Sequence, residues 1–263
     1  MSIKSNKLAC IILIFISLNY FACSELVEKK KKINDIIAEC GIEKQFSQLP
    51  EMLEQFLLLK KDSLNEDEYN KLNKIFKENF TSNDFIDSIR ASFEKNYNDK
   101  YIAKIEKFYR TELAKKMTKV EVQNSTPEFV SKVSKIKINS LKKKRIQIIK
   151  EFLKVSKALE MTILIQESTF EGFVESYNRF IPLHNRISDE TVKLIKDKME
   201  SNVYSKQNIT MMIVWAYMTY EKVSDKELKE YMEFIDSEAG QWMNDVIIKG
   251  IMAGAKKCAS KGV

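Results

Sequence analysis

The sequence predicts an all-α fold, and three observations support this prediction. Its 263 residues contain only six Gly and three Pro, too few for a fold rich in tight turns or for a glycine-rich nucleotide-binding fold. Helix-capping residues recur three positions before an acidic residue and ahead of apolar side chains spaced three or four apart. No segment of useful length alternates apolar and polar residues with the period of a β-strand.

The first 24 residues have the pattern of a secretory signal peptide. Lys4 and Lys7 precede an apolar run over residues 8–18, and small residues at Ala22 and Ser24 fit a cleavage after Ser24. The run is shorter than the roughly 20 apolar residues of a membrane-spanning helix. We therefore expect export to the periplasm or secretion, with an uncleaved anchor or a lipid attached to Cys23 as the alternatives.

Residues 25–125 are predicted to form a first group of helices. Asn65 with Glu68, and Thr81 with Asp84, have the spacing of capping pairs at helix starts. Three sets of apolar residues follow at helical spacing: Tyr69, Leu72, Ile75, Phe76 and Phe80; Phe85, Ile86, Ile89 and Phe93; and Ile102, Ile105, Phe108 and Tyr109.

Residues 126–263 are predicted to contain a long connecting helix followed by a second group of helices. Thr126, Pro127 and Glu128 supply a cap, a proline at the first helical position and an acid in the first turn. From Pro127 to about residue 181 the only further breaker is Gly172, so we expect one long helix or two in sequence. Ser188, and Ser224 with Glu227, predict the starts of later helices.

The two groups have similar residues at a regular spacing. Residues 99–117 align with residues 225–243 at a constant offset of 126, which pairs Phe108 with Phe234 and Met117 with Met243. Upstream, residues 64–67 align with residues 187–190 at an offset of 123. The sequence therefore predicts an internal duplication, in which a long central helix joins two related bundles; chance similarity between amphipathic helices is the alternative.

Two short stretches in the second group resemble a known family. Residues 223–228 (Val-Ser-Asp-Lys-Glu-Leu) and 234–241 (Phe-Ile-Asp-Ser-Glu-Ala-Gly-Gln) resemble the S-x-E-E-L and F-Y-x-S-P-x-G stretches of a family of exported bacterial helical proteins of unknown function. The chain departs from that pattern at Ile235, where the family has Tyr, and at Glu238, where it has Pro. The resemblance implies an exported helical domain and supplies no catalytic residues.

Removal of the leader would leave two cysteines, Cys40 and Cys258. In an oxidising compartment these two could form one disulfide that joins the first helix to the last. Two unpaired thiols are the alternative.

Residues suited to catalysis or metal binding are scarce. His184 is the only histidine, and the sequence has no phosphate loop, G-x-S-x-G or H-E-x-x-H motif. An enzyme would have to use His184 with carboxylates brought near by folding; a surface histidine is the alternative. Glu167, Glu171 and Glu175 share one helix face, which is more typical of a solvated surface than of an acid–base pair. We expect no metal and no cofactor.

Residues 131–157 form a strongly basic segment, with ten Lys or Arg against one acid, Glu151. At its centre are Lys142, Lys143, Lys144 and Arg145, which could contact an anionic membrane surface or nucleic acid; a solvated helix is the alternative. The chain has 39 Lys and 5 Arg, and because base recognition favours Arg and aromatic residues, we expect no nucleic-acid partner. Without the leader, this segment contributes +9 and the rest of the chain −4.

Met211, Met212, Trp215 and Met218 cluster on one apolar segment, and Trp242 follows further along the chain. Methionine-rich surfaces accept varied apolar ligands or partner helices, so these five residues are the predicted groove; a central core helix is the alternative. The sequence thus predicts an exported, non-enzymatic binding protein for an unknown protein, lipid or other apolar partner. An enzyme that uses His184, or a membrane-surface protein that uses residues 131–157, are the alternatives.

Overall fold

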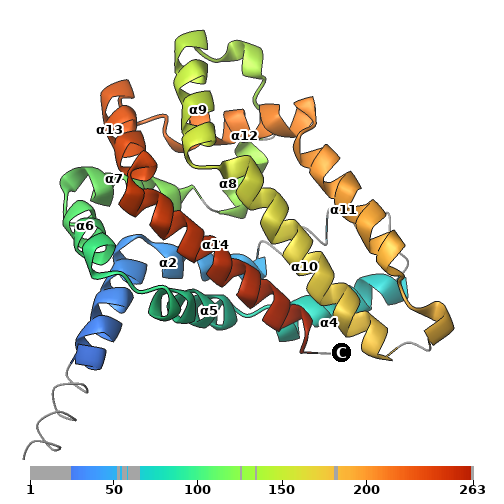
Figure 1. The fold of residues 1–263 in the computed structure, drawn as a ribbon. Helices are drawn as coiled ribbons and strands as arrows, with labels where there is room; N and C mark the ends of the chain where they lie inside the picture. The colour runs from blue at the N-terminus through green and yellow to red at the C-terminus, as the bar shows by residue number, and fades with distance from the viewer. Residues whose placement is uncertain are drawn as a thin grey trace, which may run out of the picture.

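The helix starts expected at Thr81, Ser188 and Ser224 are all present in the computed structural model, where each side chain accepts a hydrogen bond from a backbone N–H in the first turn. The structure describes residues 25–51, 54, 58, 66–124, 126–133, 135–180 and 183–261. Every regular element in those ranges is helical (Figure 1), so the all-α fold class is confirmed. The predicted signal peptide, residues 1–24, lies outside the described residues.

The described residues form a succession of helices along the chain. Residues 25–39 are helical. They are followed by α2 (Ile42–Phe46), α4 (Glu66–Asn79), α5 (Ser82–Lys95), α6 (Asp99–Tyr109) and α7 (Glu112–Gln123). The middle of the chain forms α8 (Pro127–Val133), the 3₁₀ turn η2 (Ile138–Ser140), α9 (Lys143–Val155), α10 (Ala158–Phe180) and a second 3₁₀ turn, η3 (Leu183–Asn185). The last helices are α11 (Asp189–Val203), α12 (Lys206–Thr219), α13 (Asp225–Asp236) and α14 (Glu238–Ala259).

The predicted long central helix is wrong as a continuous element. Helix α8 ends at Val133, η2 follows at Ile138–Ser140, and a new helix begins at Lys143. A second break separates α9 from α10 at Lys157, whose φ of 52° lies in the left-handed region. That conformation is unfavourable for a residue with a side chain and cannot continue a right-handed helix. Neither break contains Gly or Pro, so the sequence lacks the usual markers of a helix end.

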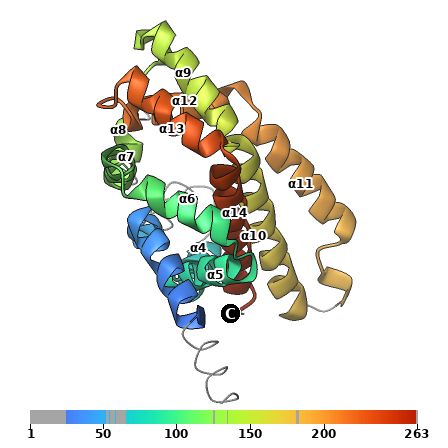
Figure 2. The same cartoon turned by 60° about the vertical axis from the view of Figure 1, so that its left-hand side comes forward.

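Helix α14 forms the centre of the molecule. It packs against α5, α6, α10 and α13, and Figure 2 shows it running beside α10. The contact with α5 is very close, because a Cβ atom built on Gly250 would lie 2.4 Å from the Cα of Ile89. Two glycines one turn apart, Gly250 and Gly254, therefore let the two backbones approach.

Two large apolar clusters make up most of the core. One contains residues from the helical segment 25–39, α5, α6 and the first half of α14. The other contains residues from α7, α9, α12 and α13. Phe108 and Phe234 contact both clusters, and their rings stack with centroids 3.6 Å apart and planes 3° from parallel. The two residues that the predicted duplication aligns therefore meet at the junction of the two clusters.

The helix boundaries keep the spacing that suggested duplication. Helices α6 and α13 begin at Asp99 and Asp225, and α7 and α14 begin at Glu112 and Glu238, 126 residues apart in each case. Packing is also reciprocal, since α6 contacts α14 and α13 contacts α7. The two helices that the duplication aligns differ in length, since α7 has 12 residues and α14 has 22. Duplication stays a prediction, which these boundaries support.

The predicted disulfide between Cys40 and Cys258 is wrong. Both thiols are free and buried. Cys40 packs in the cluster that includes Val246 of α14, whereas Cys258 packs with Phe80 and Phe85 near the end of α14. Twelve helical residues separate Val246 from Cys258, about 18 Å along the axis, so the cluster that contains Cys40 and the cluster that contains Cys258 meet α14 at different levels. Burial raises the pKa of Cys40 to about 12 and that of Cys258 to about 11.

Candidate functional site

Eight lysines of the basic segment form the most distinctive charged feature of the described surface. All eight are exposed, and within the ranges that the structure describes none has an ion-pair partner. We call them the lysine cluster: Lys132, Lys135, Lys137, Lys142, Lys143, Lys144, Lys150 and Lys154. Helix α9, which contains four of them, lies at one extremity of the molecule, far from the C-terminal end of α14, in both views (Figures 1 and 2).

Helix α9 begins in an unusual electrostatic setting. Lys142 occupies the N-cap position, no side chain caps the helix and no acid lies in its first turn. Cations near a helix N-terminus oppose the helix dipole and cost stability. Packing offsets this cost, because Ile148, Ile149 and Phe152 of α9 are buried in the core. The chain therefore concentrates positive charge at this end of α9 in spite of the local cost.

Arg145 differs from its three lysine neighbours, because it is buried and its hydrogen bonds are internal. Its guanidinium donates to the backbone oxygens of Tyr220 at 2.9 Å and Val223 at 2.8 Å. It also forms an ion pair with Asp225. Arg145 thus links α9 to the connection between α12 and α13, and it is not available to a partner in solution. Its place in the apolar stripe with Ile148, Ile149 and Phe152 is the sequence feature that could have indicated burial.

The five residues of the predicted groove do not lie together. Trp242 packs in a different core cluster, with its ring 5.7 Å from the rings of Phe93 and Tyr101. Met218 is buried and Met212 is half-buried on α12. Met211 and Trp215, by contrast, are 50% and 38% exposed. We call these last two residues the apolar pair.

The apolar pair lies beside the basic segment. Trp215 packs edge-on against Phe129 of α8, with ring centroids 6.2 Å apart. Phe129 stands three residues before Lys132 on the same helix, and α12 contacts both α8 and α9. An exposed tryptophan is therefore close to the first lysine of the cluster.

The structure does not join His184 to the acidic residues of α10. His184 is exposed in η3, and its side chain makes no ion pair or hydrogen bond with any described residue. Lys196 lies between Glu167 at 3.4 Å and Glu171 at 2.6 Å, and Glu175 is 3.9 Å from Lys256. These carboxylates therefore neutralise lysines of α11 and α14. No group of three or more His, Cys, Asp and Glu among the described residues could hold a metal ion.

No feature of the sequence indicated one half-buried polar group. Glu121 of α7 accepts a hydrogen bond of 2.6 Å from the hydroxyl of Tyr220, and Tyr231 also hydrogen-bonds to it. Burial raises the pKa of Glu121, and the two tyrosines partly offset that rise. Glu121 precedes these tyrosines by about 100 residues and follows no recognisable motif, so only folding reveals the cluster. It joins α7 to α12 and α13, which gives it a structural role.

Comparisons with known proteins match only part of the chain. Residues 83–125 match a family described as "Uncharacterized protein conserved in bacteria (DUF2059)". This match spans α5, α6 and α7, in the first helical group, whereas the resemblance in the sequence was placed on residues 223–241. The match therefore supports a bacterial family of unknown function. It does not support the particular motif that the sequence showed at residues 223–241. Comparisons with curated proteins and with solved structures found no match. Of the helices described, none is long and apolar enough to cross a membrane.

Proposed function

We propose that the chain is an exported helical binding protein whose lysine cluster takes an anionic partner. The observation that supports this proposal is that one segment holds the net positive charge of the chain. Residues 131–157 contribute +9, whereas the chain outside that segment and the leader sums to −4. The two cations of the segment that have internal partners are Arg145 and Lys157, paired with Asp225 and Asp245.

The lysine cluster supports binding because nothing within the described part of the fold neutralises it. Closely spaced like charges repel one another and produce a local positive potential that attracts anions. An anionic partner would relieve this repulsion. Lysine ammonium groups supply point charges and hydrogen-bond donors, which suits recognition of an anionic surface and requires no catalytic chemistry.

Export is part of the proposal and rests on the leader pattern of residues 1–24. Cleavage after Ser24 would leave a mature chain that begins at Glu25. Amino-terminal sequencing of the protein recovered from the host's periplasm or medium tests this directly.

Neutralisation of part of the cluster tests the binding surface. The variant K142Q/K143Q/K144Q removes three charges from the start of α9, and K95Q/K104Q/K107Q removes three exposed lysines from α5 and α6 as the matched control. Binding to heparin, polyglutamate and vesicles containing phosphatidylglycerol is measured at low salt. Wild type is expected to bind at least one probe, and the first variant to weaken binding about tenfold or more, with little change in the control. Equal weakening by both variants, or no binding to any probe, contradicts the proposal.

A further inference from the structure

We propose that the anionic partner is the headgroup surface of a phospholipid membrane, into which Trp215 and Met211 insert. This inference rests on the proposed function, because it names the partner of the same lysine cluster. Its additional evidence is the exposure of the apolar pair, Met211 and Trp215, on which the proposed function does not depend.

The apolar pair has the geometry of an interfacial contact. Met211 and Trp215 are four residues apart on α12, so they share one helix face. Both remain substantially exposed although α12 is otherwise strongly apolar and contains no Asp or Glu. Tryptophan is enriched where membrane headgroups meet the acyl chains, because its ring is apolar and its N–H is polar.

The nearby charges match an anionic lipid surface. Trp215 contacts Phe129, and Lys132 follows Phe129 by one turn of α8. Lys135 and Lys137 extend the exposed positive charge along the next connection. Basic residues next to an exposed apolar contact combine electrostatic attraction with shallow insertion, as in proteins that lie on a membrane without spanning it.

A lipid surface suits this composition better than a nucleic acid. All eight members of the lysine cluster are Lys, and the one arginine of the segment, Arg145, is buried in an internal ion pair. Nucleic-acid surfaces gain from arginine, whose planar group binds bases and phosphates at two points. Membrane attraction depends mainly on charge near the surface, which lysine supplies equally well.

Tryptophan emission tests the insertion. In the variant Trp242→Phe, Trp215 is the only tryptophan, and its emission is recorded with vesicles of phosphatidylcholine alone or with about 30% phosphatidylglycerol. We expect a blue shift with the anionic vesicles only, since the ring moves from water to a less polar interface. High salt, added before the vesicles, should prevent the shift because it screens the lysines.

A second variant separates insertion from charge. M211S/W215S keeps every lysine and changes two exposed side chains, and circular dichroism checks that its helix content equals that of wild type. We expect it to bind anionic vesicles about tenfold less tightly while its binding to heparin is unchanged. Equal vesicle affinity in M211S/W215S and wild type, or no blue shift, overturns the inference.

The same measurements distinguish the two proposals. If the protein binds heparin or polyglutamate but prefers neither kind of vesicle, the membrane inference is wrong and the proposed function stands. If none of the anionic probes binds, both are wrong.

Discussion

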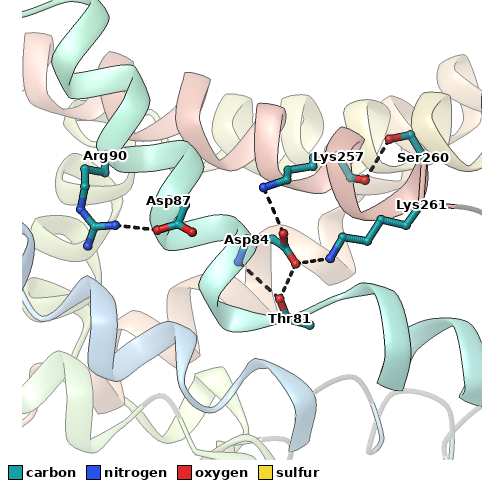
Figure 3. Close-up of polar contacts among 7 residues, drawn as sticks. All are labelled: Thr81, Asp84, Asp87, Arg90, Lys257, Ser260 and Lys261. Carbon is teal, nitrogen blue, oxygen red and sulfur yellow. Dashed lines mark hydrogen bonds and ion pairs between the residues drawn. The ribbon is translucent and has the colours of Figure 1, made fainter.

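Asp84 joins the beginning of α5 to the end of α14. Its carboxylate accepts hydrogen bonds from Thr81 and Lys261, and Lys257 lies 3.2 Å away (Figure 3). Burial alone would raise the pKa of Asp84, but the hydrogen bonds from Lys261, Thr81 and Lys257 outweigh it and lower the pKa to about 2. The ionised group therefore stabilises the fold above the unfolded pKa of about 4, and this contribution is lost as the pH falls toward 2.

Replacement of Asp84 by Asn should lower the free energy of unfolding by about 1–2 kcal/mol at pH 7. The difference from wild type should shrink between about pH 4 and pH 2, because the wild-type carboxylate becomes protonated there. Urea denaturation across this range measures both effects. Asp87→Asn is the control, since Asp87 pairs with Arg90 on the surface with 61% of its side chain exposed. A loss as large in Asp87→Asn would contradict the role given to Asp84.

The sequence predicted the role of Asp84 at the start of α5, but not its contacts with Lys257 and Lys261. The spacing of Thr81 and Asp84 marks a helix start, and the structure contains that cap. The lysine partners lie more than 170 residues further along the chain, and local spacing does not specify which helices meet. Arg145 shows the opposite case, because its burial could have been inferred from its apolar stripe, yet its charge placed it with the surface lysines.

At the scale of single helices, the contact between α5 and α14 depends on the absence of a side chain. A Cβ atom on Gly250 would lie 2.4 Å from the Cα of Ile89, and one on Gly254 would lie 3.0 Å from the Cα of Phe85. The obstacle at Gly250 is backbone, which cannot move aside as a flexible side chain can. The two helices must therefore separate to accommodate even a methyl group at Gly250.

Gly250→Ala should destabilise the protein by about 1–3 kcal/mol, as expected for overpacking, although alanine favours helix more than glycine does. Gly254→Ala should cost less, since its Cβ has more room. Thermal unfolding followed by circular dichroism measures both variants, with Ala253→Ser on the exposed side of α14 as the control. A neutral or stabilising Gly250→Ala would show that α5 and α14 are not so close.

Helix existence was more predictable from the sequence than helix continuity. Capping residues and apolar spacing located the helices that begin at Ser82, Asp189 and Asp225, because these signals are local. The break at Lys157 has no Gly or Pro to mark it. Tertiary packing selects that break, since α9 packs against α12 and α13 while α10 packs against α14 and α11.

At the scale of the whole molecule, the family match and the resemblance found in the sequence fall on different helical groups. The family model covers α5 to α7, whereas the sequence resemblance lies on α13 and the start of α14. The predicted duplication implies that both groups share one ancestral pattern and that each keeps different parts of it. It aligns Phe108 with Phe234, and the rings of these two residues stack on each other.

The distribution of charge over the molecule could be counted from the sequence, but its exposure could not. The count placed a net +9 on residues 131–157. Only the fold separates eight exposed lysines from Arg145, which is buried, and from Lys157, which lies 3.8 Å from Asp245. The predicted groove was similarly divided, because helical spacing cannot tell which side of an apolar helix is left uncovered.

The most direct test of the account is lysine footprinting. Acylation rates of individual lysines are measured by mass spectrometry, with and without the anionic probe that binds most tightly. The account predicts that the probe slows acylation within the lysine cluster, from Lys132 to Lys154, and leaves Lys95, Lys104 and Lys107 unchanged. Equal protection of all exposed lysines, or protection confined to lysines outside the cluster, would contradict it.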